Sequence, residues 1–303
     1  MKAIKYRLYC IYHSPDLDGL MSAAIVKLFY KLNNSDDQEC KYLKIIPHNY
    51  GQRLPNIQTN VPIIMSDVSV SVDEMARLSQ ISNQQFTYID HHFSAIKDFL
   101  ESDKEESKHV KTHFSLDNSK SACELTYEFL IGKDIPEIVE SLGKFDTFRV
   151  TDKAEQLYVL YVQLFCQTYY FGVNKCLELL DLEFGSLSDE QVAQGKAIYD
   201  YVKKEFNQLY RKASSIELDG VKFLAVNREY FNPIMYDIDY QSDGYDVILS
   251  YFYSVDKWKF SVYCDNGKID CSEFCKQFGG GGHQKAAGFI LSKEEFKTLN
   301  FIK

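Results

Sequence analysis

Three short apolar runs in the first hundred residues each end in acidic or histidine side chains. In an open parallel sheet, ligands collect outside the carboxyl ends of the strands, so clusters that are distant in sequence become neighbours in space. Carboxylate and imidazole groups suit Mn²⁺, Mg²⁺ or Zn²⁺, and several carboxylates suit a pair of hard ions. We therefore expect one shared metal site. The clusters are His13-Ser14-Pro15-Asp16-Leu17-Asp18, Ser66-Asp67 and Asp90-His91-His92.

Residues 1 to about 150 alternate such runs with helix-like segments, a pattern typical of βαβ units and a parallel sheet. The expected strands are Leu8–Tyr12, Tyr42–Ile46, Pro62–Met65, Phe86–Ile89 and His109–Phe114, and the expected helices are Gly19–Phe29, Ser71–Ser79 and Ala122–Leu130. From about 135 to 212 the pattern is helical, and the last helix begins with the capping-type sequence Ser188-Asp189-Glu190-Gln191.

From Ser214 onward the pattern becomes β again, with expected strands at 221–226, 246–254 and 258–263 and a short helix near 272–277. The predicted fold is α/β. We expect a catalytic domain with a parallel sheet over residues 1–185, a connector helix over 186–213, and a smaller α/β domain with a mixed sheet over 214–303.

The formal net charge of -9 argues against a protein that holds long nucleic acid by neutralising its phosphates. A short polyanion can still bind, because divalent metals concentrate positive charge where it is needed. No run of 18 apolar residues and no signal-peptide pattern is evident in the sequence, so a cytoplasmic protein without membrane association is the default expectation. Eight cysteines without a repeated CxxC spacing indicate neither a disulfide framework nor a zinc ribbon.

The acidic candidates each allow a functional and a structural interpretation. Asp16 and Asp18 can aim two carboxylates at adjacent metals if the backbone is extended there, although Asp is also common in turns. Asp67 can bridge two ions, or it can cap the following turn. Asp146, between two aromatic residues at the end of a helical stretch, is either a further ligand or a helix-end residue.

Four consecutive glycines, 279–282, precede His283 and Lys285 without the spacing of a Walker motif. Glycine amides can form a nest for phosphate oxygens, to which His283 and Lys285 would add donors. A flexible linker is the alternative. The apolar segment Ala286–Ile290 that follows indicates a packed structure instead.

The ordered motifs HxxDxD, a lone Asp, Asp-His-His, a later Asp and a terminal GGGGHxxAAGF resemble those of the DHH phosphoesterases with an appended DHHA1 domain. That group includes RecJ-like nucleases, nanoRNases and phosphatases of 3'-phosphoadenosine 5'-phosphate. The resemblance spans nearly the whole chain, from His13 to Phe289. Many members place the first histidine four residues before the first Asp, whereas His13 lies three before Asp16.

The resemblance implies a role for each matching residue. Two divalent ions are expected, with Mn²⁺ as the first choice and Mg²⁺ or Co²⁺ as alternatives. The expected ligands of one ion are His13, Asp16 and Asp67. Those of the other are Asp18, Asp67, His91 and Asp146. Asp90 is expected to orient its neighbours, and His92 to lie beside the substrate phosphate. The expected substrate-binding residues are Tyr263, Gly281, Gly282, His283 and Lys285. Many DHHA1 domains have Ser-Leu-Arg where this chain has Ser261-Val262-Tyr263. Tyr263 is therefore expected to stack on a base or to bond to it.

The predicted activity is two-metal hydrolysis of short oligonucleotides or dinucleotides to mononucleotides, as in a nanoRNase, by a monomer or homodimer. The spacing between the two domains would then measure substrate length. Processive exonuclease action on long strands is less expected, because the chain is acidic. The alternatives are a phosphatase of 3'-phosphoadenosine 5'-phosphate, a phosphodiesterase of cyclic or linear signalling nucleotides, a pyrophosphatase or exopolyphosphatase, and a nucleotide-binding protein without catalysis.

Overall fold

The computed structural model describes residues 4–103, 108–182, 185–229 and 239–298. The chain divides into two compact units, Met1–Ile198 and Tyr199–Lys303. The division falls within helix α8 (Asp189–Tyr210), so the helix that the sequence predicts as a connector contributes to both units. None of the helices in the described ranges combines the length and hydropathy that a bilayer span requires.

The first unit is built on a parallel sheet of five strands, which confirms the predicted α/β fold. The strand order is β2-β1-β3-β4-β5, and all neighbouring pairs are parallel. The strands are β1 (Leu8–His13), β2 (Leu43–His48), β3 (Ile63–Ser66), β4 (Phe86–Asp90) and β5 (Lys111–Phe114).

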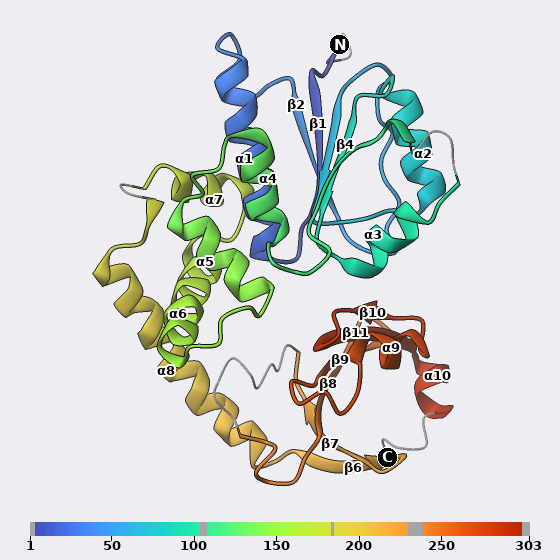
Figure 1. The fold of residues 1–303 in the computed structure, drawn as a ribbon. Coiled ribbons are helices and arrows are strands. Elements are labelled where there is room, and N and C mark those ends of the chain that lie inside the picture. Colours follow the sequence, from blue (N-terminus) through green and yellow to red (C-terminus); the bar gives the residue numbers. More distant parts are fainter. Residues whose placement is uncertain (1–3, 104–107, 183–184, 230–238, 299–303) are drawn as a thin grey trace. The chain divides into compact units, whose positions relative to one another are not determined.

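Helices cover both faces of this sheet. On one face lie α1 (Leu17–Asn33) and α4 (Ala122–Leu130), and on the other lie α2 (Val72–Ile81) and α3 (Phe93–Leu100), as Figure 1 shows. The strand period of two explains the arrangement: in β1, Cys10 packs in the cluster beneath α1, and Ile11 packs in the cluster beneath α2. Because both faces are covered, the three inner strands β1, β3 and β4 are buried almost throughout.

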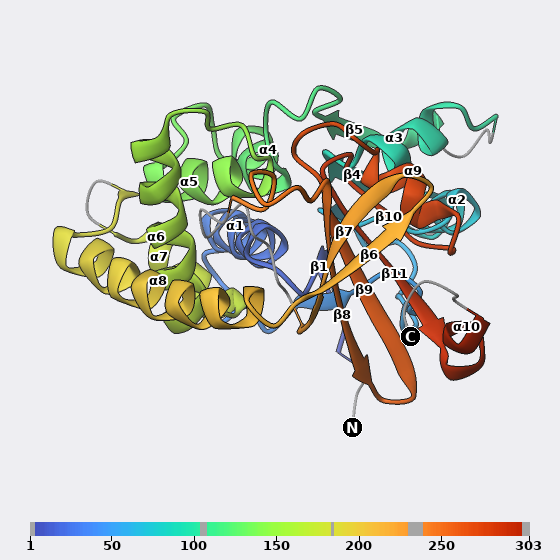
Figure 2. The ribbon, with the colours of Figure 1, turned by 90° about the horizontal axis from the view of Figure 1, so that it is seen from below.

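Three further helices extend the α1 side of the first unit. They are α5 (Glu137–Asp146), α6 (Lys153–Tyr169) and α7 (Val173–Leu180). Figure 2 shows them grouped beside α1, and their apolar residues Leu142, Phe165 and Leu179 join the same core cluster. Helix α8 begins with the predicted cap, in which the Ser188 Oγ accepts from the Gln191 amide at 3.3 Å and the Gln191 Oε1 accepts from the Ser188 amide at 2.9 Å.

Some element boundaries differ from the prediction. Helix α1 begins at Leu17, so Asp18 lies in its first turn and not on extended backbone. Strand β2 continues through Pro47 to His48; a proline is tolerated there because β2 is at the edge of the sheet. Helix α3 was not predicted, and His92 at its N-cap makes no side-chain capping hydrogen bond.

The second unit contains a mixed sheet in the order β10-β11-β9-β8-β7-β6, with β7 and β8 parallel and the other pairs antiparallel. Two short helices, α9 and α10, accompany it (Figure 2). The bounds are β6 (Ser214–Leu218), β7 (Val221–Asn227), β8 (Val247–Ser254), β9 (Lys257–Tyr263), α9 (Cys271–Lys276), β10 (Gly281–Gly282), β11 (Ala286–Ser292) and α10 (Lys293–Thr298).

Candidate metal centre

The register of the parallel sheet brings residues of the three predicted motifs together. One row of the sheet joins Tyr12 of β1, Ser66 of β3 and Ile89 of β4. The residues that follow these three lie together at the carboxyl edge: His13, Asp67 and Asp90. The three motifs are therefore neighbours because the strands are parallel and in this register.

Asp67 adopts a left-handed backbone conformation, with φ of +63°. Few residues other than glycine do so, and Asp tolerates it better than most. The conformation directs its buried carboxylate between two imidazoles: Oδ2 lies 3.7 Å from the His13 Nδ1, and Oδ1 lies 3.4 Å from the His91 Nε2. A costly backbone conformation at this position is consistent with a functional constraint.

The first group of candidate ligands is His13, Asp16 and Asp67, whose ligand atoms lie within 4.8 Å of one another. Asp16 is the N-cap of α1: its Oδ1 accepts from the Gly19 amide at 3.0 Å, and its Oδ2 lies 2.6 Å from the His13 Nδ1. A Cβ atom at Gly19 would lie 1.9 Å from the carbonyl oxygen of His13. Glycine thus lets α1 begin directly against the end of β1.

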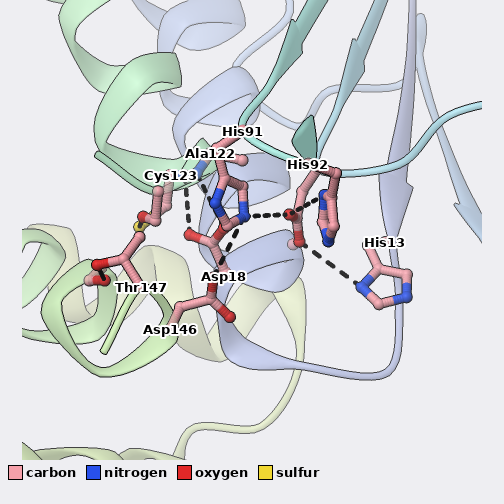
Figure 3. Close-up of polar contacts among 12 residues, drawn as sticks. His13, Asp18, His91, His92, Ala122, Cys123, Asp146 and Thr147 are labelled. Atoms are coloured by element: carbon pink, nitrogen blue, oxygen red, sulfur yellow. Dashed lines mark hydrogen bonds and ion pairs between the residues drawn. The ribbon is translucent and has the colours of Figure 1, made fainter. Parts of the chain in front are cut away.

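The second group surrounds the buried Nε2 atom of His91, as Figure 3 shows. That atom lies 3.6 Å from Asp18 Oδ2, 3.4 Å from Asp67 Oδ1 and 3.2 Å from Asp146 Oδ2. Asp146 is the last residue of α5, and Asp18 is in the first turn of α1. Asp67 belongs to both groups and turns one oxygen toward each.

The N-terminus of α4 holds Asp18 in place. The Ala122 amide donates to Asp18 Oδ2 and the Cys123 amide donates to Oδ1, both at 2.9 Å (Figure 3). These amides are the donors that the first turn of a helix leaves unpaired, and the helix dipole favours a carboxylate there. These two hydrogen bonds favour the ionised form of Asp18, whose side chain is only 3% exposed.

Burial and mutual repulsion shape the pKa values of the carboxylates. Burial raises the pKa of Asp18 well above its ordinary value, and the charges of Asp67 and Asp146 raise it further. Burial raises the pKa of Asp146 to about 6. Burial has the same tendency at Asp67, but the facing imidazoles of His13 and His91 outweigh it and hold that pKa below its ordinary value. The cluster thus attracts either protons or cations.

The residues present fit divalent cations. Within the described ranges, both carboxylate oxygens of Asp67 and the Oδ2 of Asp146 are buried and make no well-directed hydrogen bond. Leaving such atoms unsatisfied is costly, and a metal ion would satisfy them. The structure brings all six predicted ligands together; that they bind two ions stays a prediction. They are His13, Asp16, Asp18, Asp67, His91 and Asp146.

Asp90 is engaged by protein donors. Its Oδ1 accepts from the backbone amides of His91 and His92 at 2.8 and 3.2 Å and lies 2.8 Å from the His92 Nδ1. Its Oδ2 accepts from the hydroxyl of Tyr88. Burial lowers the pKa of His92, but the charge of Asp90 outweighs it, so the pKa is raised. The orienting role predicted for Asp90 and the phosphate contact predicted for His92 stay predictions.

Several residues that contact the centre were not predicted from the sequence. Tyr88 could have been identified from the sequence as a partner of Asp90. Residues two apart on a strand share a face, so the two side chains point the same way. Asn49, whose Oδ1 lies 3.3 Å from the His13 Nε2, carries no signal in the sequence. Asn118, whose Oδ1 lies 2.9 Å from the His91 Nδ1, is marked only by a turn-forming Asp-Asn-Ser sequence.

The glycine run of the second unit forms part of the sheet and is not a flexible linker. Gly281 and Gly282 form β10, where they pair with Gly288 and Ala287 of β11. A Cβ atom at Gly280 would lie 2.1 Å from the carbonyl oxygen of Gly288, so close packing of the two backbones requires glycine there. At Gly281, in contrast, a Cβ atom would meet nothing within 4 Å.

The other candidate substrate-binding residues surround this hairpin. The His283 amide donates to the carbonyl oxygen of Ala286 at 2.8 Å, which closes the turn that contains Lys285. Tyr263, at the end of β9, pairs with Ala286. The structure therefore gathers Tyr263, Gly281, Gly282, His283 and Lys285 around one hairpin, and their contact with a substrate stays a prediction.

Known proteins similar to this chain were found by sequence and by structure. Residues 7–145 match the sequence profile of the DHH family, N-terminal domain. The uncharacterized protein R106 of Acanthamoeba polyphaga mimivirus is 24% identical over 304 residues, which cover 93% of this chain and 67% of that protein.

Two solved structures illustrate the structural similarity. The pGpG-specific phosphodiesterase PggH from Vibrio cholerae is 16% identical, with a TM-score of 0.49, over 97% of this chain and 95% of that chain. An exopolyphosphatase-related protein from Bacteroides fragilis is 15% identical, with a TM-score of 0.46, over 95% of this chain and 87% of that chain. The match over residues 7–145, which contain five of the six candidate ligands, shows that the N-terminal part of this chain is similar to the DHH family, N-terminal domain.

Proposed function

We propose that this protein is a two-metal phosphoesterase that hydrolyses short oligonucleotides or dinucleotides to mononucleotides. The match to the DHH family supports a phosphoester hydrolase. The proposal adds the substrate, the number of ions and their identity. Nitrogen and oxygen donors of this kind suit Mn²⁺, and they also accept Mg²⁺ or Co²⁺.

The observation that carries the proposal is the position of Asp67. Its two oxygens face different groups of ligands, one containing His13 and the other containing His91. A carboxylate that serves one ion with each oxygen is the usual bridge in a two-metal hydrolytic site. Both groups remain partly unsatisfied by protein donors, which supports binding of ions at each.

Two bound cations would supply a water nucleophile at neutral pH and would neutralise charge on the phosphoryl oxygens. The protein's own contribution begins with His92. Its Nδ1 donates to Asp90, and we assign the donation to a substrate oxygen to the other ring nitrogen, Nε2. The carboxylate of Asp90 favours the protonated imidazole that such donation requires. Asp90 is in turn held by the hydroxyl of Tyr88.

We further propose that the β10–β11 hairpin binds the nucleotide portion of the substrate. The backbone of Gly281 is open to close approach, and His283 and Lys285 lie in the adjoining turn. Tyr263 offers an aromatic ring, a group on which any base can stack. The net charge of -9 supports a short substrate, because a long strand needs an extended basic surface.

The test is a substrate panel with Mn²⁺: a 5'-labelled dinucleotide, a long single strand, 3'-phosphoadenosine 5'-phosphate, a cyclic dinucleotide and pyrophosphate. We expect the highest kcat/KM on the dinucleotide. Asp67→Asn should lower every turnover by about 1,000-fold or more, because two-metal stabilisation is worth several kcal/mol. Asp98→Asn, an exposed Asp on α3, is the control and should leave turnover unchanged. Preference for the long strand or for pyrophosphate would refute the proposed substrate, and an active Asp67→Asn would refute the mechanism.

A further inference from the structure

Asn118 lies in the loop between β5 and α4, and its side chain contacts the metal centre at His91. Its side-chain Nδ2 donates to the carbonyl oxygen of Thr147 at 3.1 Å. Its Oδ1 lies 2.9 Å from the Nδ1 of His91. Asn118 has a φ of +57°, a left-handed conformation that Asn adopts more readily than most residues. The side chain thus connects the ends of β4 and α5.

These two contacts determine where the proton of His91 resides. A carbonyl oxygen only accepts hydrogen bonds, so the group of Asn118 that faces Thr147 must be its NH₂. The oxygen of the amide must then face His91. Because that oxygen also only accepts, the Nδ1 of His91 must carry a proton. In the neutral imidazole, the lone pair is consequently on Nε2.

The Nε2 of His91 is the atom that faces Asp18, Asp67 and Asp146. The opposite tautomer would point a hydrogen atom at the position where a cation would lie. Thr147 directly follows Asp146, and its hydroxyl donates to the carbonyl oxygen of Gly143 at 2.7 Å, which fixes this end of α5. The amide of Asn118 therefore contacts one candidate ligand, His91, and the residue that follows another, Asp146.

We propose that Asn118 is a positioning residue for the second ion. It selects the tautomer of His91 that presents Nε2, and it aligns that imidazole with the helix end that carries Asp146. The inference rests on the proposed metal centre. It concerns only the second group, since His13 of the first group has its own partner in Asn49, on the opposite ring nitrogen.

The test variant is Asn118→Gly, because glycine tolerates φ of +57° without strain and removes both contacts. Asn83→Gly is the matched control: Asn83 is exposed on the surface and has a φ of +56°. Calorimetric titration with Mn²⁺ should show one of the two ions bound about 10–100-fold more weakly in Asn118→Gly, the usual cost of removing an outer partner of a ligand, and wild-type binding in Asn83→Gly.

Histidine ¹⁵N NMR of the Zn²⁺-loaded protein separates tautomer selection from general damage. We expect ligation through Nε2 of His91 in the wild type and in Asn118→Asp, which keeps an acceptor, and a loss of this single state in Asn118→Gly. Wild-type ion affinities and unchanged His91 signals in Asn118→Gly would overturn the inference, as would Asn118→Asp behaving like Asn118→Gly. If Asn118→Gly does not fold, loss of Nε2 ligation in Asn118→Asp still overturns it. A wild type that binds two ions but hydrolyses no phosphoester contradicts only the proposed function.

Discussion

Gly19 is the position where one added methyl group should disable the metal centre. It follows Asp18 in the first turn of α1, and a Cβ atom there would lie 1.9 Å from the carbonyl oxygen of His13. Real Cβ contacts stay above 3.0 Å, so in Gly19→Ala the start of α1 and the end of β1 must separate by at least about 1.1 Å, the difference between the two distances. Candidate ligands lie on both sides of that contact.

A displacement of about 1 Å can cost on the order of 100-fold in activity, and overpacking costs about 1–3 kcal/mol of stability. We expect Gly19→Ala to fold with reduced stability in urea, to bind Mn²⁺ more weakly and to lose about 100-fold in kcat/KM. The control is Ser22→Ala in the same helix, because the buried hydroxyl of Ser22 makes no hydrogen bond within the described ranges. Gly19→Ala with wild-type Mn²⁺ affinity and turnover would refute the reasoning.

Three further predictions concern other parts of the molecule. Because Asp146 has a pKa of about 6, above its ordinary 3.8, the metal-free folded state retains a proton between these values that the unfolded state has released. Its stability in urea should therefore fall as the pH rises from about 4 to 6, and Mn²⁺ should oppose the fall; a rise without metal would contradict this. Gly280→Ala should unfold more easily than the wild type. Gly281→Ala should keep wild-type stability and bind a dinucleotide more weakly. Equal stabilities of the two variants would argue against the close packing of Gly280 on the Gly288 backbone. Tyr88→Phe removes a donor to the buried Asp90 and should cost about 1.5–3 kcal/mol in urea denaturation with Mn²⁺ affinity retained; no loss of stability would contradict the role of the hydrogen bond.

The parallel sheet was predictable because its signals are local. Apolar runs that end in Asp and His identify both the strands and the edge at which they end. Helix α3 was not predictable in this way, because it starts directly after His92 without a capping hydrogen bond. The extension of β2 through Pro47 required knowledge that the strand lies at an edge.

That the candidate ligands lie together was predictable from residue type and order, but the atoms that hydrogen-bond to them were not. The amides that bind Asp18 belong to Ala122 and Cys123, which are 104 and 105 residues further along the chain. Any residue supplies a backbone amide, so no sequence pattern identifies those two. Asn118 is similar: its role depends on a contact with the backbone of Thr147, and only the folded chain brings the two together.

The central claim is that Asp67 bridges two cations, and anomalous X-ray diffraction from crystals soaked in Mn²⁺ tests it most directly. We predict two peaks, one on each side of the Asp67 carboxylate and about 3.5–4 Å apart, as in other two-metal sites. One peak should lie beside His13 and the other beside His91. A single peak, or peaks that do not touch Asp67, would contradict the account.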